Sequence, residues 1–240
     1  MDGQKGLLLW LRWVGANSVA EAIGLGSTLA LDFVIVSRLA AQTLWAAIAT
    51  IILVAASGAV EGVVVGLLQW LVIHRPLPLV SRRAWVTFTA VGAVVAWFFG
   101  SLPSTLMDMS AQNTEAAAQE PPASTMLLLA ATMGVFLGFV LGYSQWCVLR
   151  RAAHGAWLWI PANCVAWALG MPAIFAAIDL AQRSTSLVGT LATMMAGLLL
   201  TGALVGAVHG LVLVKLASQA QATSTQGLAT TEANGNHGRR

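Results

Sequence analysis

The sequence predicts an all-α integral membrane protein, a six-span helical bundle of three repeated two-helix hairpins with both termini in the cytoplasm. The composition points to a membrane: 58% of residues are hydrophobic, 9% are charged and the mean hydropathy is +0.79. A soluble domain carries about 25% charged residues. Apolar stretches long enough to cross a hydrocarbon core of about 30 Å also recur along the chain. Finally, one spaced pattern occurs three times, and internal repetition specifies architecture.

The repeated pattern is two glycines four residues apart, a Gln or His three residues later, and a basic residue six further on. Its copies are Gly62, Gly66, Gln69 and Arg75; Gly138, Gly142, Gln145 and Arg151; and Gly202, Gly206, His209 and Lys215. A Val-Ala-x-x-x-Gly trio precedes each copy, at Val19, Ala20 and Gly24; at Val95, Ala96 and Gly100; and at Val165, Ala166 and Gly170. Glycines at this spacing let helix backbones approach closely.

We expect the bundle to occupy residues 1–216. The apolar stretches predict spans near 12–34, 44–73, 85–107, 126–149, 157–180 and 187–214. Paired in order, they form hairpins over about 12–73, 85–149 and 157–214. Pro172 should kink the fifth span, because proline removes a backbone hydrogen bond.

Two segments are expected to lie outside the membrane. Residues 102–125 contain three acidic residues, no basic residue and a Pro-Pro pair, so we expect an irregular acidic outer loop. Residues 217–240 are polar, with almost no apolar residue, which predicts a disordered cytoplasmic tail.

The net charge of +3 is distributed unevenly over the two sides of the predicted bundle. Only Arg38 and Arg183 lie on the outer side, while the other ten of the twelve basic residues lie on the side of the termini. Cytoplasmic loops carry such an excess, so we expect a cell (cytoplasmic) membrane location with both termini inside, and no nucleic-acid partner. An interfacial aromatic belt is expected at the same boundary, from Trp10, Trp13, Trp85, Trp157 and Trp159.

A polar layer is expected about 9 Å inside that boundary, from the rise of 1.5 Å per helical residue. Its members are Asn17, Gln69, Gln145, Asn163 and His209. The layer has two interpretations: a selectivity or substrate layer, or amides that hydrogen-bond between helices because an unpaired amide in lipid is costly. The neighbouring glycines favour the second. His209 lacks a second His at similar depth, so we expect no haem or other cofactor, and no metal-ligand spacing is present.

Two carboxylates break the repeat near the membrane midplane. Glu21 and Glu61 lie about 13 and 21 Å from the basic boundary, and no intramembrane base accompanies them. Ionisable residues at this depth are costly and usually face a cavity or a partner. Two carboxylates in contact would share a proton, which suits a relay or a cation site. The alternative is a pair of neutral, hydrogen-bonded acids with no further role.

The third candidate group is an outer acidic ring. Asp32, Asp108 and Asp179 lie eight or nine residues after the glycines of the Val-Ala trios, which gives one carboxylate per hairpin. A ring of this kind would attract cations to an outer mouth. The alternative is that each Asp simply ends a span.

One stretch of sequence resembles a known group of proteins. Gly138-Phe-Val-Leu-Gly-Tyr-Ser-Gln-Trp-Cys-Val-Leu-Arg-Arg, followed by Trp157-Leu-Trp-Ile-Pro-Ala-Asn, is similar to uncharacterised bacterial multi-pass membrane proteins that repeat Gly-x3-Gly-x2-Gln-Trp-x-Val-Leu-Arg. Gly62 to Arg75 carries a second copy, and the third keeps only its skeleton. The resemblance implies a bacterial cytoplasmic membrane and brings no established activity.

Two functions therefore stay open. The bundle translocates protons, cations or a small solute past Glu21 and Glu61, or it is a non-catalytic scaffold that binds membrane proteins or a second copy through its glycine stripes. Gly142-Tyr-Ser144 and Ala207-Val-His209 resemble fragments of rhomboid-protease motifs, but Gln145 stands where those motifs have glycine. We therefore expect no enzyme.

Overall fold

The protein is described by a computed structural model, which covers residues 3–39, 43–112 and 122–237 and gives only the backbone of 106–112 and 223–237. The elements are α1 (Gly3–Leu39), α2 (Leu44–Ile73), α3 (Arg82–Gln112), α4 (Ala123–Leu149), the short 3-10 helix η1 (Ala156–Leu158), α5 (Trp159–Gln182) and α6 (Leu187–His237). Six of these helices are long and apolar enough to cross a membrane. This confirms the predicted all-helical class and a multi-pass membrane character.

Four of the connections place a polar or conformationally free residue where the next helix begins, whereas α4 begins after Pro122, which makes no side-chain cap hydrogen bond. The Thr43 hydroxyl accepts a hydrogen bond from the Ala46 amide at the start of α2, and Ser81 and Ser186 have the same role before α3 and α6. Such caps satisfy backbone donors that lack an intrahelical partner. Gly155, with a φ of 71°, turns the chain into η1 in the left-handed region that glycine adopts without steric cost.

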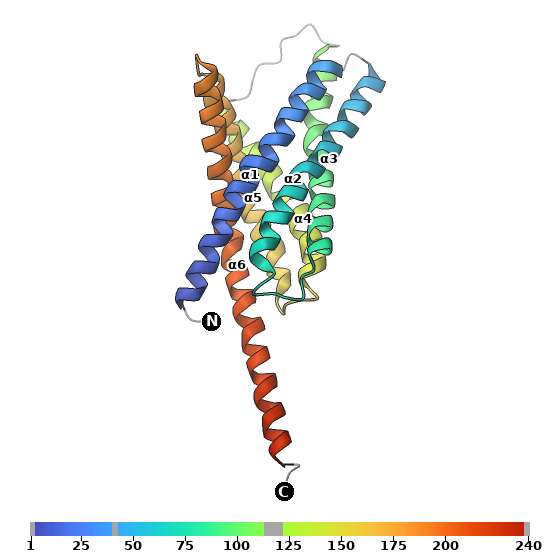
Figure 1. Ribbon diagram of the computed structural model, residues 1–240. Coiled ribbons are helices and arrows are strands. Elements are labelled where there is room, and N and C mark those ends of the chain that lie inside the picture. The colour runs from blue at the N-terminus through green and yellow to red at the C-terminus, as the bar shows by residue number, and fades with distance from the viewer. Residues whose placement is uncertain (1–2, 40–42, 113–121, 238–240) are drawn as a thin grey trace.

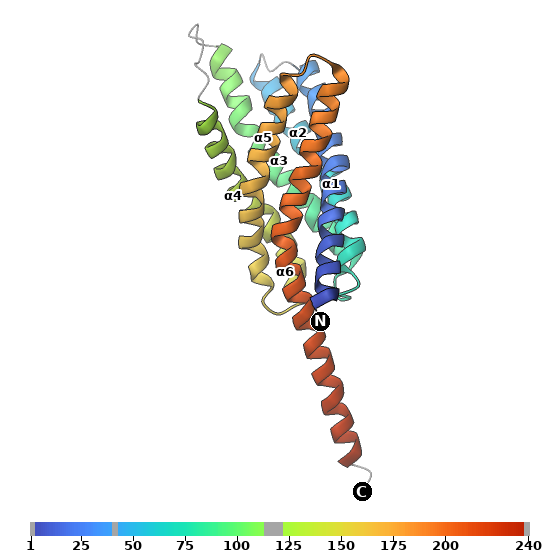
Figure 2. The same ribbon diagram turned by 90° about the vertical axis from the view of Figure 1, so that its left-hand side faces the viewer.

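The helices form one closed ring in chain order. Each helix packs on the helices that precede and follow it, and α6 packs on α1. Figures 1 and 2 show them running side by side, with α1 beginning and α6 leaving the bundle at the same end. We call this the terminal end, and the other the opposite end. A ring of six helices encloses a central axis, and the polar residues described below lie around it.

Three tight seams in this ring, α2–α3, α4–α5 and α6–α1, are made at the repeated glycines. A Cβ at Gly138 would collide with the carbonyl of Asn163, and a Cβ at Gly202 with the carbonyl of Asn17. At Gly62 it would lie 2.5 Å from a backbone atom of α3. The glycine stripes therefore contact helices of the same chain.

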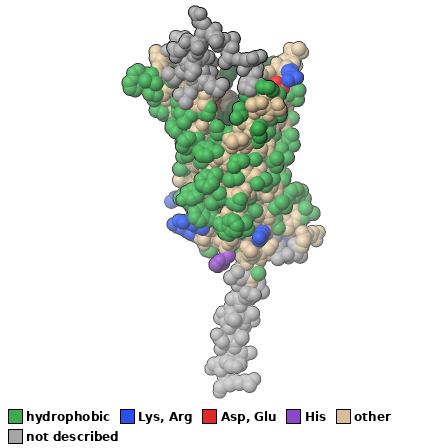
Figure 3. All heavy atoms as spheres, turned by 180° about the vertical axis from the view of Figure 1, so that it is seen from behind, with side chains coloured by type: hydrophobic (Ala, Val, Ile, Leu, Met, Phe, Trp, Pro, Cys, Tyr) green, Lys and Arg blue, Asp and Glu red, His purple; other side chains and the backbone are tan. Residues whose placement is uncertain are grey.

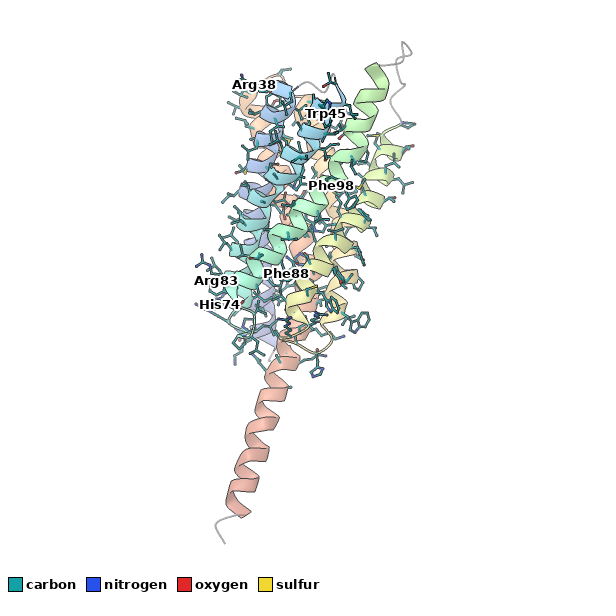
Figure 4. All side chains as sticks on the ribbon, turned by 90° about the vertical axis from the view of Figure 1, so that its right-hand side faces the viewer. Arg38, Trp45, His74, Arg83, Phe88 and Phe98 are labelled. Carbon is teal, nitrogen blue, oxygen red and sulfur yellow. The ribbon has the colours of Figure 1, made fainter. Side chains whose placement is uncertain are left out.

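The surface matches a bundle in lipid. Hydrophobic side chains cover the visible face between the two ends, and basic side chains gather near the terminal end (Figure 3). His74 and Arg83 lie toward the terminal end, while Arg38 and Trp45 lie at the opposite end (Figure 4). The large exposed side chains include Phe33 and Trp45, which are 76% and 79% exposed. Exposed side chains of this kind are compatible with a lipid environment.

An aromatic and aliphatic cluster fills the core near the terminal end. Trp13, Trp85 and Trp159 are fully buried in it, with the Trp13 and Trp85 ring centroids 5.8 and 6.2 Å from that of Trp159. The interfacial belt predicted for these three residues is therefore wrong, although Trp157 is exposed. Depth along the chain does not reveal which side of a helix faces the axis, and these three rings face inward. We call this cluster the inner plug.

Three helices extend well beyond their predicted ends. α1 runs from Gly3 to Leu39, where a span near 12–34 was expected. α3 runs to Gln112 and α4 begins at Ala123, so much of the expected irregular loop is helical, while residues 113–121 lie outside the described part. α6 runs to His237, where a disordered tail was expected from residue 217. Leu216 and Ala217 are fully buried, and Ala220 packs against the inner plug. Hydropathy marks where the apolar part of a helix ends, whereas alanine and glutamine continue a helix well.

Candidate functional site

Three members of the predicted polar layer form a continuous hydrogen-bonded chain across the bundle. We call the five-residue layer the amide layer from here on. All five of its members are at least 97% buried. Gln69 Nε2 donates to Asn17 Oδ1 at 2.8 Å, and Gln145 Nε2 donates to Gln69 Oε1 at 3.0 Å. Gln145 Nε2 also donates to the Thr89 hydroxyl, 3.1 Å away. The layer thus joins α1, α2, α3 and α4 through side chains alone.

Two tryptophans of the inner plug donate to this layer. Trp159 Nε1 donates to Gln145 Oε1, and Trp13 Nε1 donates to His209 Nδ1, each at 2.8 Å. The His209 ring also stacks on Trp159, with centroids 5.2 Å apart. Because Nδ1 of His209 accepts, it carries no proton. Asn163 donates to the Trp159 carbonyl on its own helix.

Glu21 and Glu61 lie together on the opposite side of the amide layer from the inner plug. Both are buried, with 1% and 6% of their surface exposed. They line the same small cavity and interact electrostatically. Gly24 permits the close approach, since a Cβ there would lie 3.2 Å from the backbone Cα of Glu61. The two carboxylates predicted at the midplane are therefore neighbours.

The two carboxylates differ in their partners. Glu61 Oε2 accepts a hydrogen bond from Trp97 Nε1 at 2.7 Å. Glu21 Oε2 is buried and has no hydrogen-bond partner among the described residues. The buried polar and charged side chains of the described part include neither Lys nor Arg. Nothing described here balances two negative charges, so a proton or a cation must do so when both groups are buried.

The small cavity lies on the axis between the carboxylates and the amide layer. Its volume is about 20 Å³, which is room for about one water molecule. Every one of the six helices contributes to its wall, and Gln69, Gln145, Asn163 and His209 line it together with Glu21 and Glu61. It therefore connects the carboxylate pair to the polar layer.

A much larger cavity of about 630 Å³ extends from Glu61 toward the opposite end. Val36 and Ser104 line it and are exposed, so they mark its mouth. Most of the wall is apolar, and its polar residues are Asp32, Thr50, Glu61, Ser101, Ser104 and Thr105, with the indoles of Trp97 and Trp167. Glu61 lines both cavities, as do Ala93, Leu141 and Trp167, whereas Glu21 lines only the small one.

The three aspartates predicted as an outer ring have different surroundings. Asp32 lines the large cavity, and its Oδ1 accepts a 2.6 Å hydrogen bond from the Ser57 hydroxyl. Asp179 is exposed and pairs with Arg183 on its own helix, 2.7 Å away. The Asp108 side chain lies outside the described residues. Asp32 is thus the described aspartate that faces the cavity, while Asp179 ends its helix beside a base.

Sequence reasoning missed several residues of the site. Trp97 and Trp167 occupy the repeat positions of Glu21 and line the large cavity, and Thr89 occupies the repeat position of Trp13 and Trp159. The repeat alignment placed them at the right depth but gave no reason to single out an indole or a hydroxyl. The unpartnered hydroxyl of Thr50 had no sequence signal, because Thr50 lies outside the repeated pattern.

Comparison of the chain with protein-family models, curated proteins and solved structures gives no match. Within the described ranges, no group of three His, Cys, Asp or Glu side chains is placed to hold a metal ion. Ser144, the candidate from the rhomboid fragment, donates to the Leu141 carbonyl of its own helix. The function is argued below from the geometry of the two cavities.

Proposed function

We propose that the bundle translocates protons, or a cationic solute in exchange for protons, through the carboxylate pair Glu21 and Glu61. The observation that carries the proposal is the position of Glu61 at the floor of the large cavity, with Glu21 directly behind it. A carboxylate in this position is reached from the opposite end and can pass a proton to its buried neighbour. Intramembrane carboxylates without a basic partner are typical of such relays.

The inner plug makes this a gated path. Three fully buried tryptophans and several aliphatic side chains close the axis between the amide layer and the terminal end. Passage beyond the amide layer therefore requires these rings to move. The hydrogen bonds from Trp13 to His209 and from Trp159 to Gln145 couple the plug to the polar layer. A change of charge at Glu21 would act first on the hydrogen bonds of this layer, because the layer and Glu21 line the same cavity.

The test is flux of protons and monovalent cations into proteoliposomes that contain the full chain, measured without an organic cation and with tetraethylammonium inside the vesicles. We expect the native protein to conduct and Glu21→Gln/Glu61→Gln to lose flux, because glutamine keeps the shape but does not carry a titratable proton. Asp179→Asn is the matched control, since it removes an exposed carboxylate outside the cavity. Flux equal to that of empty liposomes for every protein would contradict the proposal.

We also propose that the bundle is built from three related hairpins with both termini in the cytoplasm. The repeated glycines support this, because they make equivalent seams at α2–α3, α4–α5 and α6–α1. The basic residues support the orientation, because most of them lie toward the terminal end. With this orientation, the large cavity opens to the outside of the cell.

The orientation predicts different labelling of two exposed positions. In a background without Cys147 and Cys164, Thr185→Cys should react with a membrane-impermeant maleimide in intact cells. His154→Cys should react only after the membrane is permeabilised. Both side chains are exposed and lie in turns, Thr185 between α5 and α6 and His154 between α4 and η1. The reverse labelling pattern would invert the orientation.

One argument for the alternative function, a membrane scaffold, is weakened by the packing of the glycines. It assigned the glycine stripes to partner helices, but the stripes already contact helices of this chain. A partner would have to use the apolar outer surface, which lipid also covers. The translocation proposal uses the buried carboxylates, for which an inert spacer has no need.

A further inference from the structure

The large cavity is the size of a binding site for an organic molecule. Pockets that bind small molecules occupy about 300–1,000 Å³ and are mostly apolar, with a few convergent polar groups. This cavity has about 630 Å³ and a largely apolar wall, so it matches both features. A path for protons or a bare cation needs only a narrow file of polar groups. The volume beyond what such a file requires therefore indicates an occupant with an apolar body.

The polar groups in the wall select the charge of that occupant. Asp32 and Glu61 both line the cavity, and the described residues of its wall include no Lys, Arg or His. Thr50, only 6% exposed, also lines the cavity, and its hydroxyl has no hydrogen-bond partner among the residues that the structure describes. One oxygen of Asp32, Oδ2, is likewise buried without a partner. These are acceptors for a positively charged or hydrogen-bond-donating ligand.

The aromatic residues of the wall fit the same chemistry. Trp97 donates its N–H to Glu61 and still lines the cavity, and Trp167 lines it beside the floor. Indole rings attract cations through the negative face of the ring, most strongly where water is excluded. Aromatic rings recognise quaternary ammonium ligands in this way.

We propose that the large cavity binds a small organic cation with an apolar body, with Glu61 and Asp32 as its counter-charges. This inference rests on the proposed function, because it names the class of solute that would exchange with the proton on Glu61. Binding of the cation and protonation of Glu61 then exclude each other, since both neutralise the same carboxylate. Charge is conserved when the bound cation displaces one proton.

The test is binding of radiolabelled tetraphenylphosphonium to the full chain in detergent micelles, corrected for protein-free micelles. We expect saturable binding that Glu61→Gln weakens roughly tenfold or more, because the substitution removes a counter-charge from a poorly hydrated site. Asp179→Asn should bind like the native protein. Tetraphenylborate, which has the same shape and the opposite charge, should not compete.

A steric variant keeps the test valid if Glu61→Gln does not fold. Gly100 lines the cavity, and a Cβ there would meet only Leu137, at an ordinary contact distance of 3.9 Å. Gly100→Phe therefore adds a ring to the cavity wall from a position where the Cβ itself meets no clash, and it should weaken binding. Binding unchanged in Gly100→Phe, or equal competition by tetraphenylborate, would overturn the ligand assignment.

The binding and flux measurements separate the two proposals. Binding in micelles needs no gradient, and the proteoliposome assay is read both without an organic cation and with tetraethylammonium inside the vesicles. Saturable binding that Gly100→Phe weakens, without flux in either condition, would support the ligand site and contradict translocation. Flux that depends on Glu21 and Glu61 without tetraphenylphosphonium binding would keep translocation and remove the organic cation.

Discussion

Gly138→Ala is expected to destabilise the bundle by about 1–3 kcal/mol, although it adds a single methyl group. The added Cβ would collide with the carbonyl of Asn163 and crowd the backbone at Cys164. Backbone atoms cannot rotate away as a flexible side chain can, so α4 and α5 must separate. Separation also weakens the contacts that place Asn163 and Trp159 against the amide layer. The expected loss is therefore in stability and in the yield of folded protein.

Gly15→Ala is the matched control for this substitution. Gly15 is exposed on α1, and a Cβ there would meet nothing within 4 Å. Alanine has a higher helix propensity than glycine, so this variant should be at least as stable as the native protein. Reversible unfolding in mixed micelles measures both. If Gly138→Ala and Gly15→Ala have the same stability, the close α4–α5 seam is not present in the folded protein.

Substitutions at the other two seams test whether the three repeated seams contribute equally to stability. Gly62→Ala and Gly202→Ala would place a Cβ against the backbones of α3 and α1. We expect costs of the same sign and similar size at all three seams. A cost at only one seam would mean that the sequence repeat does not produce equivalent packing.

Hydropathy and spacing in the sequence were enough to predict the helical class, and residues that they placed at one depth, such as Asn17, Gln69 and Gln145, lie together in the bundle. Depth follows from counting residues along a helix, which is why the amide layer and the carboxylate pair were found as groups. The direction in which a side chain points was not predictable in the same way. Trp13, Trp85 and Trp159 were expected at the lipid interface for this reason, yet they fill the core.

The large cavity lay beyond what the sequence indicates. Its volume depends on how the helices pack and on which side chains line the space between them. Gly100 illustrates the difficulty: it has the repeat position of Gly24 and Gly170, whose added Cβ atoms would meet neighbouring atoms at 3.2 and 2.8 Å. Three glycines at one repeat position thus have two different surroundings. Only the packed structure distinguishes them.

Gln145→Leu is expected to cost about 2–4 kcal/mol, the second large effect. Gln145 makes three side-chain hydrogen bonds at once, to Gln69, to Thr89 and from Trp159. Leucine has a similar volume but leaves the Trp159 N–H and the Gln69 carbonyl without partners in an apolar core. Ser144→Ala is the neighbouring control, because the Ser144 hydroxyl bonds only to its own helix and its loss should cost little.

The combination of Gln145→Leu with Gln69→Leu distinguishes a network from independent pairs. If the amide layer acts as one unit, the first substitution already leaves Gln69 without its donor, so the second should cost less than it does in the native background. The double-mutant cycle, measured by the same unfolding assay, should therefore show a coupling of about 0.5–2 kcal/mol. Additive costs would mean that each amide is held separately. The layer would then fix the helices in place without transmitting a change at Glu21 to the inner plug.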